Sequence, residues 1–153
     1  MATARLQAEI EINAPVSVVW SMVSDVSRMP QWSPQCRIMK ALGPIRPGTR
    51  TINLNRRGLL FWPTTSVITE VVPERKFAFR IPLNTTVWSY ELEPTATGTR
   101  LVETRHAENG VTAVSTAVTK VALGGTDSFE RELLEGMNDG LARIKAAAEG
   151  RHT

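Results

Sequence analysis

Residues 127–149 read DSFERELLEGMNDGLARIKAAAE, and this stretch decides the fold. Its apolar residues recur at spacings of three and four, which places them on one face of a long helix. That face consists of Phe129, Leu133, Leu134, Met137, Leu141, Ile144 and Ala148. Asp127 is suited to cap the N-terminus of the helix, with Glu130 three residues later as in a capping box. A helix with one apolar stripe is stable only against another surface, so the rest of the chain must supply that surface.

Length and composition predict a single soluble globular domain over 1–153, with an ordered core at about 5–149. The 153 residues are 42% apolar and 22% charged, ordinary values for such a domain. No apolar run is long enough to cross a bilayer and no secretory signal opens the sequence, so we expect a cytoplasmic protein without stable membrane insertion. The formal charge of +3 predicts no nucleic-acid partner. We expect a monomer or a homodimer.

The first half of the chain begins with a half-buried strand. Residues 6–12 alternate strictly between apolar and polar side chains, which is the strand period. Pro15 follows and suits a first helical turn, so 16–24 is predicted as a short helix. Two prolines in the next stretch, 25–34, predict a broken second helix and a loop. Two short helices after the first strand are therefore expected.

The middle of the chain reads as six further strands separated by short turns. They are predicted at 36–42, 49–57, 64–72, 76–81, 85–93 and 99–108. Such short connections imply antiparallel pairing, because parallel strands need crossovers of a dozen or more residues. Residues 109–125 are either a short helix or a mobile cover.

Several short motifs resemble one known superfamily. They are Asn13-Ala14-Pro15 after a strand, Val18-Val19-Trp20 in a helix, the run Trp88-x-Tyr90-x-Leu92-x-Pro94, Gly98-Thr99-Arg100-Leu101-Val102, and the C-terminal LARIKAAAE. Across essentially the whole chain the pattern resembles the START-like (SRPBCC) superfamily, in particular bacterial polyketide cyclase/dehydratase-type and lipid-binding proteins.

The resemblance implies an α+β helix-grip fold. In this fold a seven-stranded antiparallel sheet wraps around a long C-terminal helix, with two short helices at one end. It also implies an apolar cavity between sheet and helix that holds lipids, polyketides or other hydrophobic molecules. Some members of the superfamily catalyse cyclisation or dehydration there, and many only bind and carry their ligand.

Candidate polar groups come from the last two strands. Placing Glu103 and Arg105 outside, because charges avoid the core, leaves Thr104 and His106 facing the helix beside Tyr90. His106 is then the candidate acid or base, and Tyr90 a candidate proton donor. A hydrogen-bonded histidine and a buried tyrosine without catalytic roles are the alternatives.

The remaining candidates would line the cavity or fill the core. The full ligand-binding set is Trp32, Leu54, Trp62, Phe77, Phe79, Trp88, Tyr90, Thr104, His106, Phe129, Leu133 and Met137. Gly136 and Gly140, four apart beside the apolar stripe, either leave room for a ligand or permit a close approach of the sheet. With one Cys and two His, no metal site is expected, and no cofactor motif is present.

Three functions remain open from the sequence. The first is binding of a hydrophobic small molecule between sheet and helix. The second is a cyclase or dehydratase acting on a polyketide-like substrate in the same cavity. The third is a protein-interaction module, such as a chaperone co-factor or a toxin-type partner. Fold resemblance alone does not choose among them.

Overall fold

The computed structural model describes residues 5–33, 35–82, 85–107 and 126–152, with side chains described from Glu130 to Gly150 in the last of these segments. The prediction for residues 109–125 lies outside this range. The elements in chain order are β1 (Arg5–Ile12), α1 (Val16–Val23), η1 (Val26–Arg28), α2 (Met29–Trp32), β2 (Cys36–Ala41), β3 (Arg50–Arg57), β4 (Leu60–Val72), β5 (Lys76–Ile81), β6 (Thr86–Pro94), β7 (Thr99–Ala107) and α4 (Thr126–His152).

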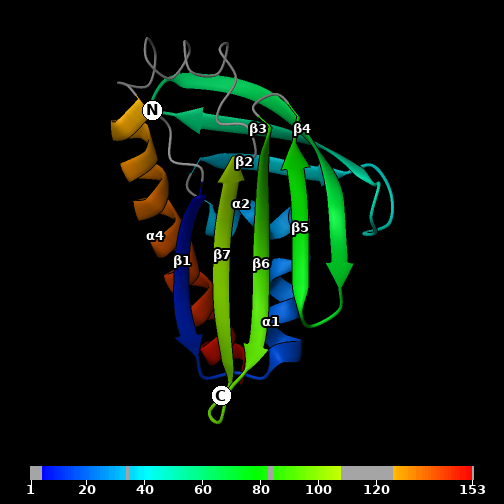
Figure 1. Ribbon diagram of the computed structural model, residues 1–153, viewed down its shortest axis with the longest axis vertical. Coiled ribbons are helices and arrows are strands. Elements are labelled where there is room, and N and C mark those ends of the chain that lie inside the picture. Colours follow the sequence, from blue (N-terminus) through cyan, green and yellow to red (C-terminus); the bar gives the residue numbers. More distant parts are fainter. Residues whose placement is uncertain (1–4, 34, 83–84, 108–125, 153) are drawn as a thin grey trace.

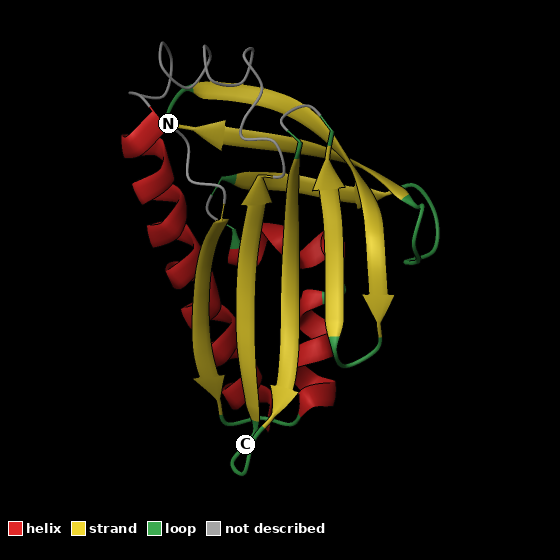
Figure 2. Ribbon diagram, in the orientation of Figure 1, coloured by secondary structure: helices red, strands yellow, loops and turns green. Residues whose placement is uncertain are grey.

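The seven strands form one antiparallel sheet in the order β1-β7-β6-β5-β4-β3-β2. The described helices lie on one face of this sheet, with α4 running beside β1, α1 packing against β6, and η1 and α2 next to β2 (Figures 1 and 2). β2, β3 and the first part of β4 cross the top of the molecule at a steep angle to the other strands. The predicted helix-grip fold is confirmed.

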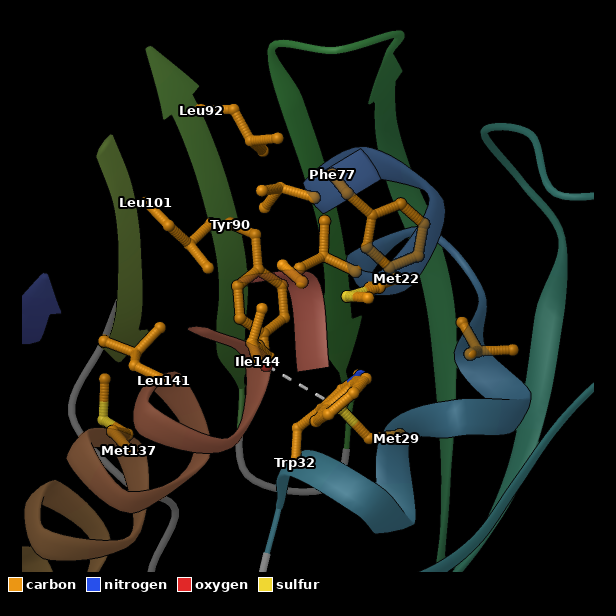
Figure 3. Close-up of a cluster of buried hydrophobic side chains, with 14 of the residues drawn as sticks. Met22, Met29, Trp32, Phe77, Tyr90, Leu92, Leu101, Met137, Leu141 and Ile144 are labelled. Carbon is orange, nitrogen blue, oxygen red and sulfur yellow. Dashed lines mark hydrogen bonds between the residues drawn. The ribbon is translucent and has the colours of Figure 1, made fainter. Parts of the chain in front are cut away.

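The core forms where the apolar stripe of α4 meets the inner face of the sheet. Leu141 and Ile144 are almost fully buried and point towards Leu101 and Tyr90 (Figure 3). The C-terminal half of α4 is also tied to β1 by polar contacts. Lys145 Nζ donates to the Glu11 carbonyl at 2.9 Å. These contacts fix the position of the helix along the sheet.

One strand is longer than the sequence indicated. β4 begins at Leu60 and includes Pro63, whereas proline suggested a later start at 64. β5 pairs with β4 only from Val67 onward, so at Pro63 the strand has a single hydrogen-bonded neighbour, β3. A proline without an N–H is tolerated at such an edge position.

Gly140 allows α4 to touch α2, not the sheet. A Cβ atom built there would lie 2.2 Å from the Trp32 carbonyl oxygen. We expect Gly140→Ala to lower the free energy of unfolding by about 1–3 kcal/mol, as overpacked positions do, despite a gain of about 1 kcal/mol in helix propensity. Urea denaturation measures this loss. The matched control is Gly150→Ala, where the added methyl meets open space. Equal stability of the two variants would contradict the close contact.

Candidate functional site

β7 presents its charged residues to the helix. Glu103 is opposite Tyr90 on β6, and Leu101 is opposite Leu92, so all four side chains share the inner face. Glu103 and Arg105 are 8% and 3% exposed. Charged side chains are seldom so deeply buried, and here each of the two has a polar partner inside the protein.

The prediction that Thr104 and His106 face the helix is therefore wrong. The two residues alternate with Glu103 and Arg105, so they lie on the outer face, where His106 is exposed and pairs with Val87. His106 cannot share a ligand with Tyr90 between sheet and helix. The rule that charges stay out of a core fails here because Arg105 has a buried counter-ion.

That counter-ion is Glu130, in the first turns of α4. Arg105 Nη2 lies 3.1 Å from Glu130 Oε2, and the two side chains are 3% and 9% exposed. A buried charge is tolerated only when it is paired and hydrogen-bonded. The pair therefore joins the end of β7 to the beginning of the long helix, and it places two charged groups between the sheet and α4.

Glu103 and Tyr90 form a second polar group in the same wall. Burial raises the pKa of Glu103 to about 8, and the neighbouring Tyr90 hydroxyl, which hydrogen-bonds the carboxyl group, opposes that rise. Burial and the nearby Glu103 hold the pKa of Tyr90 well above its usual range. At neutral pH both groups are mainly protonated, and one of their two protons forms the hydrogen bond between them.

Sulfur and indole groups surround this pair. The Tyr90 hydroxyl lies 3.9 Å from Met29 Sδ, as the dashed line in Figure 3 shows. Burial raises the pKa of the Cys36 thiol to about 11. Trp32 Nε1 is buried and has no hydrogen-bond partner within the described part of the chain. An uncompensated buried N–H is uncommon in proteins and is available to a ligand.

The inner face of β3 and β4 is polar. Asn53 and Asn55 lie opposite the buried residues Met39 and Cys36 of β2, so their side chains point inward. Both Nδ2 atoms donate to Thr64 Oγ1, at 3.2 and 3.0 Å. The inner face of β3 and β4 therefore offers amide and hydroxyl groups, whereas the sequence suggested an apolar lining.

A salt bridge connects this wall to α4. Arg57 Nε lies 2.9 Å from both carboxylate oxygens of Glu132, and Arg57 Nη2 lies 2.7 Å from Oε2. This contact lowers the pKa of Glu132. The side chains are about one-third exposed, so the pair contributes little stability but holds the end of β3 against the helix.

Two tryptophans face inward without being fully covered. Trp62 is opposite Asn55 and Trp88 is opposite Phe79, which places both on the inner face. Each is only half-buried, whereas Trp32, Phe77 and Phe79 are buried. Inward-facing indoles that keep exposed surface are suited to contact a ligand.

The structure does not unite all the predicted residues. Leu54 lies opposite the exposed Ile38, on the outer face, so its assignment to the cavity lining is wrong. Met137 is buried and Leu133 half-buried on α4. Phe129 lies outside the residues whose side chains are described. Sequence reasoning missed Asn53, Asn55, Glu103, Arg105 and Glu130.

Within the described residues, no three His, Cys, Asp or Glu side chains are grouped to hold a metal ion. No helix in that part of the chain is long and apolar enough to span a bilayer.

Several solved structures share this fold. StfQ, a di-domain ARO/CYC protein from the steffimycin biosynthetic pathway, is 15% identical with a TM-score of 0.78; the alignment covers 97% of this chain and 51% of StfQ. The chain thus spans about half of that protein. Cgl2372 from Corynebacterium glutamicum, a Polyketide_cyc-like protein, is 24% identical with a TM-score of 0.65, over 97% of this chain and 93% of the other.

A third structure, TTHA0849 from Thermus thermophilus, is 18% identical with a TM-score of 0.69, over 94% of this chain and 99% of the other. No match was found among curated proteins. The family model for polyketide cyclase/dehydrase and lipid transport proteins matches residues 3–149, nearly the whole chain. By this match, the chain belongs to the polyketide cyclase/dehydrase and lipid transport family.

Proposed function

We propose that this protein binds a hydrophobic small molecule, such as a lipid or a polyketide, between the inner face of the sheet and α4. One observation carries the proposal. The inner wall combines half-buried tryptophans with protonated polar groups that are sealed from solvent, Tyr90 and Glu103. Ligand sites in proteins have this composition, with a mainly apolar surface and a few placed polar groups.

The polar groups would orient the ligand by hydrogen bonding. A neutral Glu103 carboxyl or the Tyr90 hydroxyl can donate to a carbonyl or hydroxyl oxygen. The apolar body of the ligand would then lie against Trp62 and Trp88. Asn53 and Asn55 on the neighbouring strand favour a molecule that carries more than one oxygen.

Tryptophan fluorescence of the protein in solution tests this proposal. A panel of oleic acid, cholesterol and the hydroxylated anthraquinone emodin should include a compound that binds with saturation. We expect Trp62→Ala to weaken that binding at least about tenfold, equivalent to about 1.4 kcal/mol. The control is Phe61→Ala on the outer face of the same strand, which should change it less than about twofold. Equal effects of the two variants would place the ligand elsewhere.

A second candidate function is catalysis in the same place, as a cyclase or dehydratase. The observation that favours it is the pKa of Glu103, about 8, beside the Tyr90 hydroxyl. A group that titrates near neutral pH can accept and return a proton efficiently. In its ionised form, which becomes abundant near pH 8, Glu103 could remove a proton next to a ligand carbonyl while Tyr90 donates a hydrogen bond to the carbonyl oxygen.

Glu103→Gln separates the two functions. With a poly-β-ketone surrogate followed by mass spectrometry, an enzyme should lose turnover at least about a hundredfold in this variant, as removal of a general base does. Binding, measured by fluorescence, should stay within about threefold. Absence of any product with the native protein, despite saturable binding, would leave binding alone as the function.

A further inference from the structure

The outer face of the top of the sheet exposes an unusual amount of apolar surface. Seven large hydrophobic residues are exposed in the described part of the chain, and six of them fall between residues 38 and 61. Ile38, Ile52 and Phe61 lie on the outer face, and Leu59 lies in the β3–β4 turn. Leu42 and Ile45 lie in the loop between β2 and β3, at the other end of β3. Scattered exposed hydrophobic residues need no explanation, but a concentration on one part of the surface marks an interaction site.

The same segment is strongly basic. Residues 26–69 contain no Asp or Glu, although the chain has 15 acidic residues in all. The segment's seven basic residues are Arg28, Arg37, Lys40, Arg46, Arg50, Arg56 and Arg57. Its charge is therefore +7, and the rest of the chain, with 11 basic and 15 acidic residues, carries −4. The small total charge hides this division.

Strand register brings the apolar and basic side chains together. Ile38, Leu54 and Pro63 lie side by side across β2, β3 and β4, and Ile52 and Phe61 lie in the adjoining rows. By strand alternation, Lys40, Arg50 and Arg56 point to the same side. We call these eight residues the basic apolar face.

The turn of the β3–β4 hairpin lies at one end of this face and forms an apolar tip. Gly58 has a φ of +62°, which suits the first position of a two-residue turn between Arg57 and Leu60. The turn leaves Leu59 95% exposed at its apex. The Arg56 guanidinium lies 5.3 Å from the centre of the Phe61 ring. Cation and aromatic ring are thus held side by side next to the tip.

We propose that the basic apolar face docks reversibly on an anionic lipid bilayer. Leu59 and Phe61 would enter the head-group region, while Lys40, Arg50 and Arg56 pair with lipid phosphates. Peripheral membrane proteins combine these same two elements, buried apolar area and electrostatic attraction. Arg57 serves a different purpose, because its salt bridge to Glu132 joins the tip to α4.

A groove beside β2 offers further basic partners. Its volume is about 490 Å³, and its lining includes Pro30, Arg37, Lys40 and Ile45 together with one acidic residue, Asp25. A phosphate-bearing head group would meet both basic side chains there, with apolar surface next to them. The groove shares Lys40 with the basic apolar face and so extends it to the edge of the sheet.

Charge decides against other occupants of this face. A second copy of the chain would bring two strongly positive surfaces together, which electrostatic repulsion opposes. A nucleic acid would satisfy the arginines but leave Leu59 and Ile52 in water. An anionic bilayer matches both properties at once. Docking also places the Arg57–Glu132 contact, which joins the end of β3 to α4, close to the membrane.

A dye at position 59 reports insertion directly. The lone Cys36 is buried with a raised thiol pKa, so an environment-sensitive dye will label Leu59→Cys selectively. We expect a blue shift with phosphatidylglycerol vesicles at low salt and none with phosphatidylcholine vesicles. The control is the same dye at Val72→Cys, at the other end of β4. No response at position 59, or an equal response at 72, would overturn the proposal.

Sedimentation with the same vesicles tests the two contributions separately. Leu59→Glu/Phe61→Glu and Lys40→Glu/Arg56→Glu should each weaken binding at least about tenfold. Val72→Glu and Arg75→Glu are the matched controls and should change it less than about twofold. Circular dichroism checks that each variant is folded. Sedimentation unchanged in both double variants, or a dye response to duplex DNA only, would refute docking. Binding of the hydrophobic ligand is measured without vesicles. The ligand-binding proposal and the membrane-docking proposal can therefore fail independently of each other.

Discussion

Arg105→Met is expected to lower the free energy of unfolding by about 3–5 kcal/mol. The substitution leaves the Glu130 carboxylate in the interior without the guanidinium 3.1 Å away. A buried ion that loses its partner keeps its full desolvation cost, which is why breaking such a pair is far more damaging than never having formed it. Urea denaturation near neutral pH measures the loss.

The exposed pair on α4 provides the control for this loss. Arg143 and Asp139 lie 3.0 Å apart, but both side chains are about half exposed. Arg143→Met should cost less than about 0.5 kcal/mol, as for an ordinary helix-surface pair. Replacing both buried partners, in Arg105→Met/Glu130→Leu, should recover much of the stability lost. A cost for Arg105→Met as small as that of the control would contradict the buried ion pair.

Glu103→Gln is expected to make the protein more stable than the native chain at alkaline pH. Glu103 has a pKa of about 8 in the folded state, above its usual value of 4.5 in the unfolded chain. The folded state therefore holds the proton more tightly. Native stability falls as pH rises between these two values, by up to about 1.4 kcal/mol per pH unit. The neutral Gln side chain removes this dependence.

The difference in unfolding free energy between variant and native protein should thus grow in favour of Gln from about pH 5 to about pH 8 and then level off. Denaturation series at several pH values measure it. Glu135→Gln, at an exposed position on α4, controls for the general loss of one acidic residue and should show no such trend. A difference that stays constant with pH would mean that Glu103 is ionised in the folded protein at neutral pH.

The sequence indicated the architecture well, because its periodic signals are local. The stripe of α4 and the alternation in β1 depend only on neighbouring residues, and both predictions are confirmed. Antiparallel pairing followed from the short turns. These features do not require knowledge of which distant residues meet.

Face assignment failed where distant residues decide it. Arg105 is buried because Glu130 lies opposite it, 25 residues further along the chain. On β3 the polar residues Asn53 and Asn55 point inward because Thr64 on β4 accepts their hydrogen bonds, and the apolar Ile52 is left outside. Alternation identifies two faces of a strand, but only its partners determine which one is inside.

One signal was present in the sequence and escaped notice. The absence of acidic residues from 26 to 69 is visible without any structure, yet net charge over the whole chain conceals it. Charge counted by segment, together with the apolar run at 59–62 beside two arginines, would have indicated a basic apolar surface. The structure adds that these residues share one exposed face.

We propose that a hydrophobic molecule binds between the sheet and α4. Native mass spectrometry of the protein purified from its source organism, followed by organic extraction, tests for this molecule. We expect a stoichiometric adduct that extraction releases as a lipid or polyketide and that Trp62→Ala reduces while Phe61→Ala does not. Repeated recovery of unliganded protein, with no change in melting temperature across the ligand panel, would contradict the claim and favour a protein-interaction role.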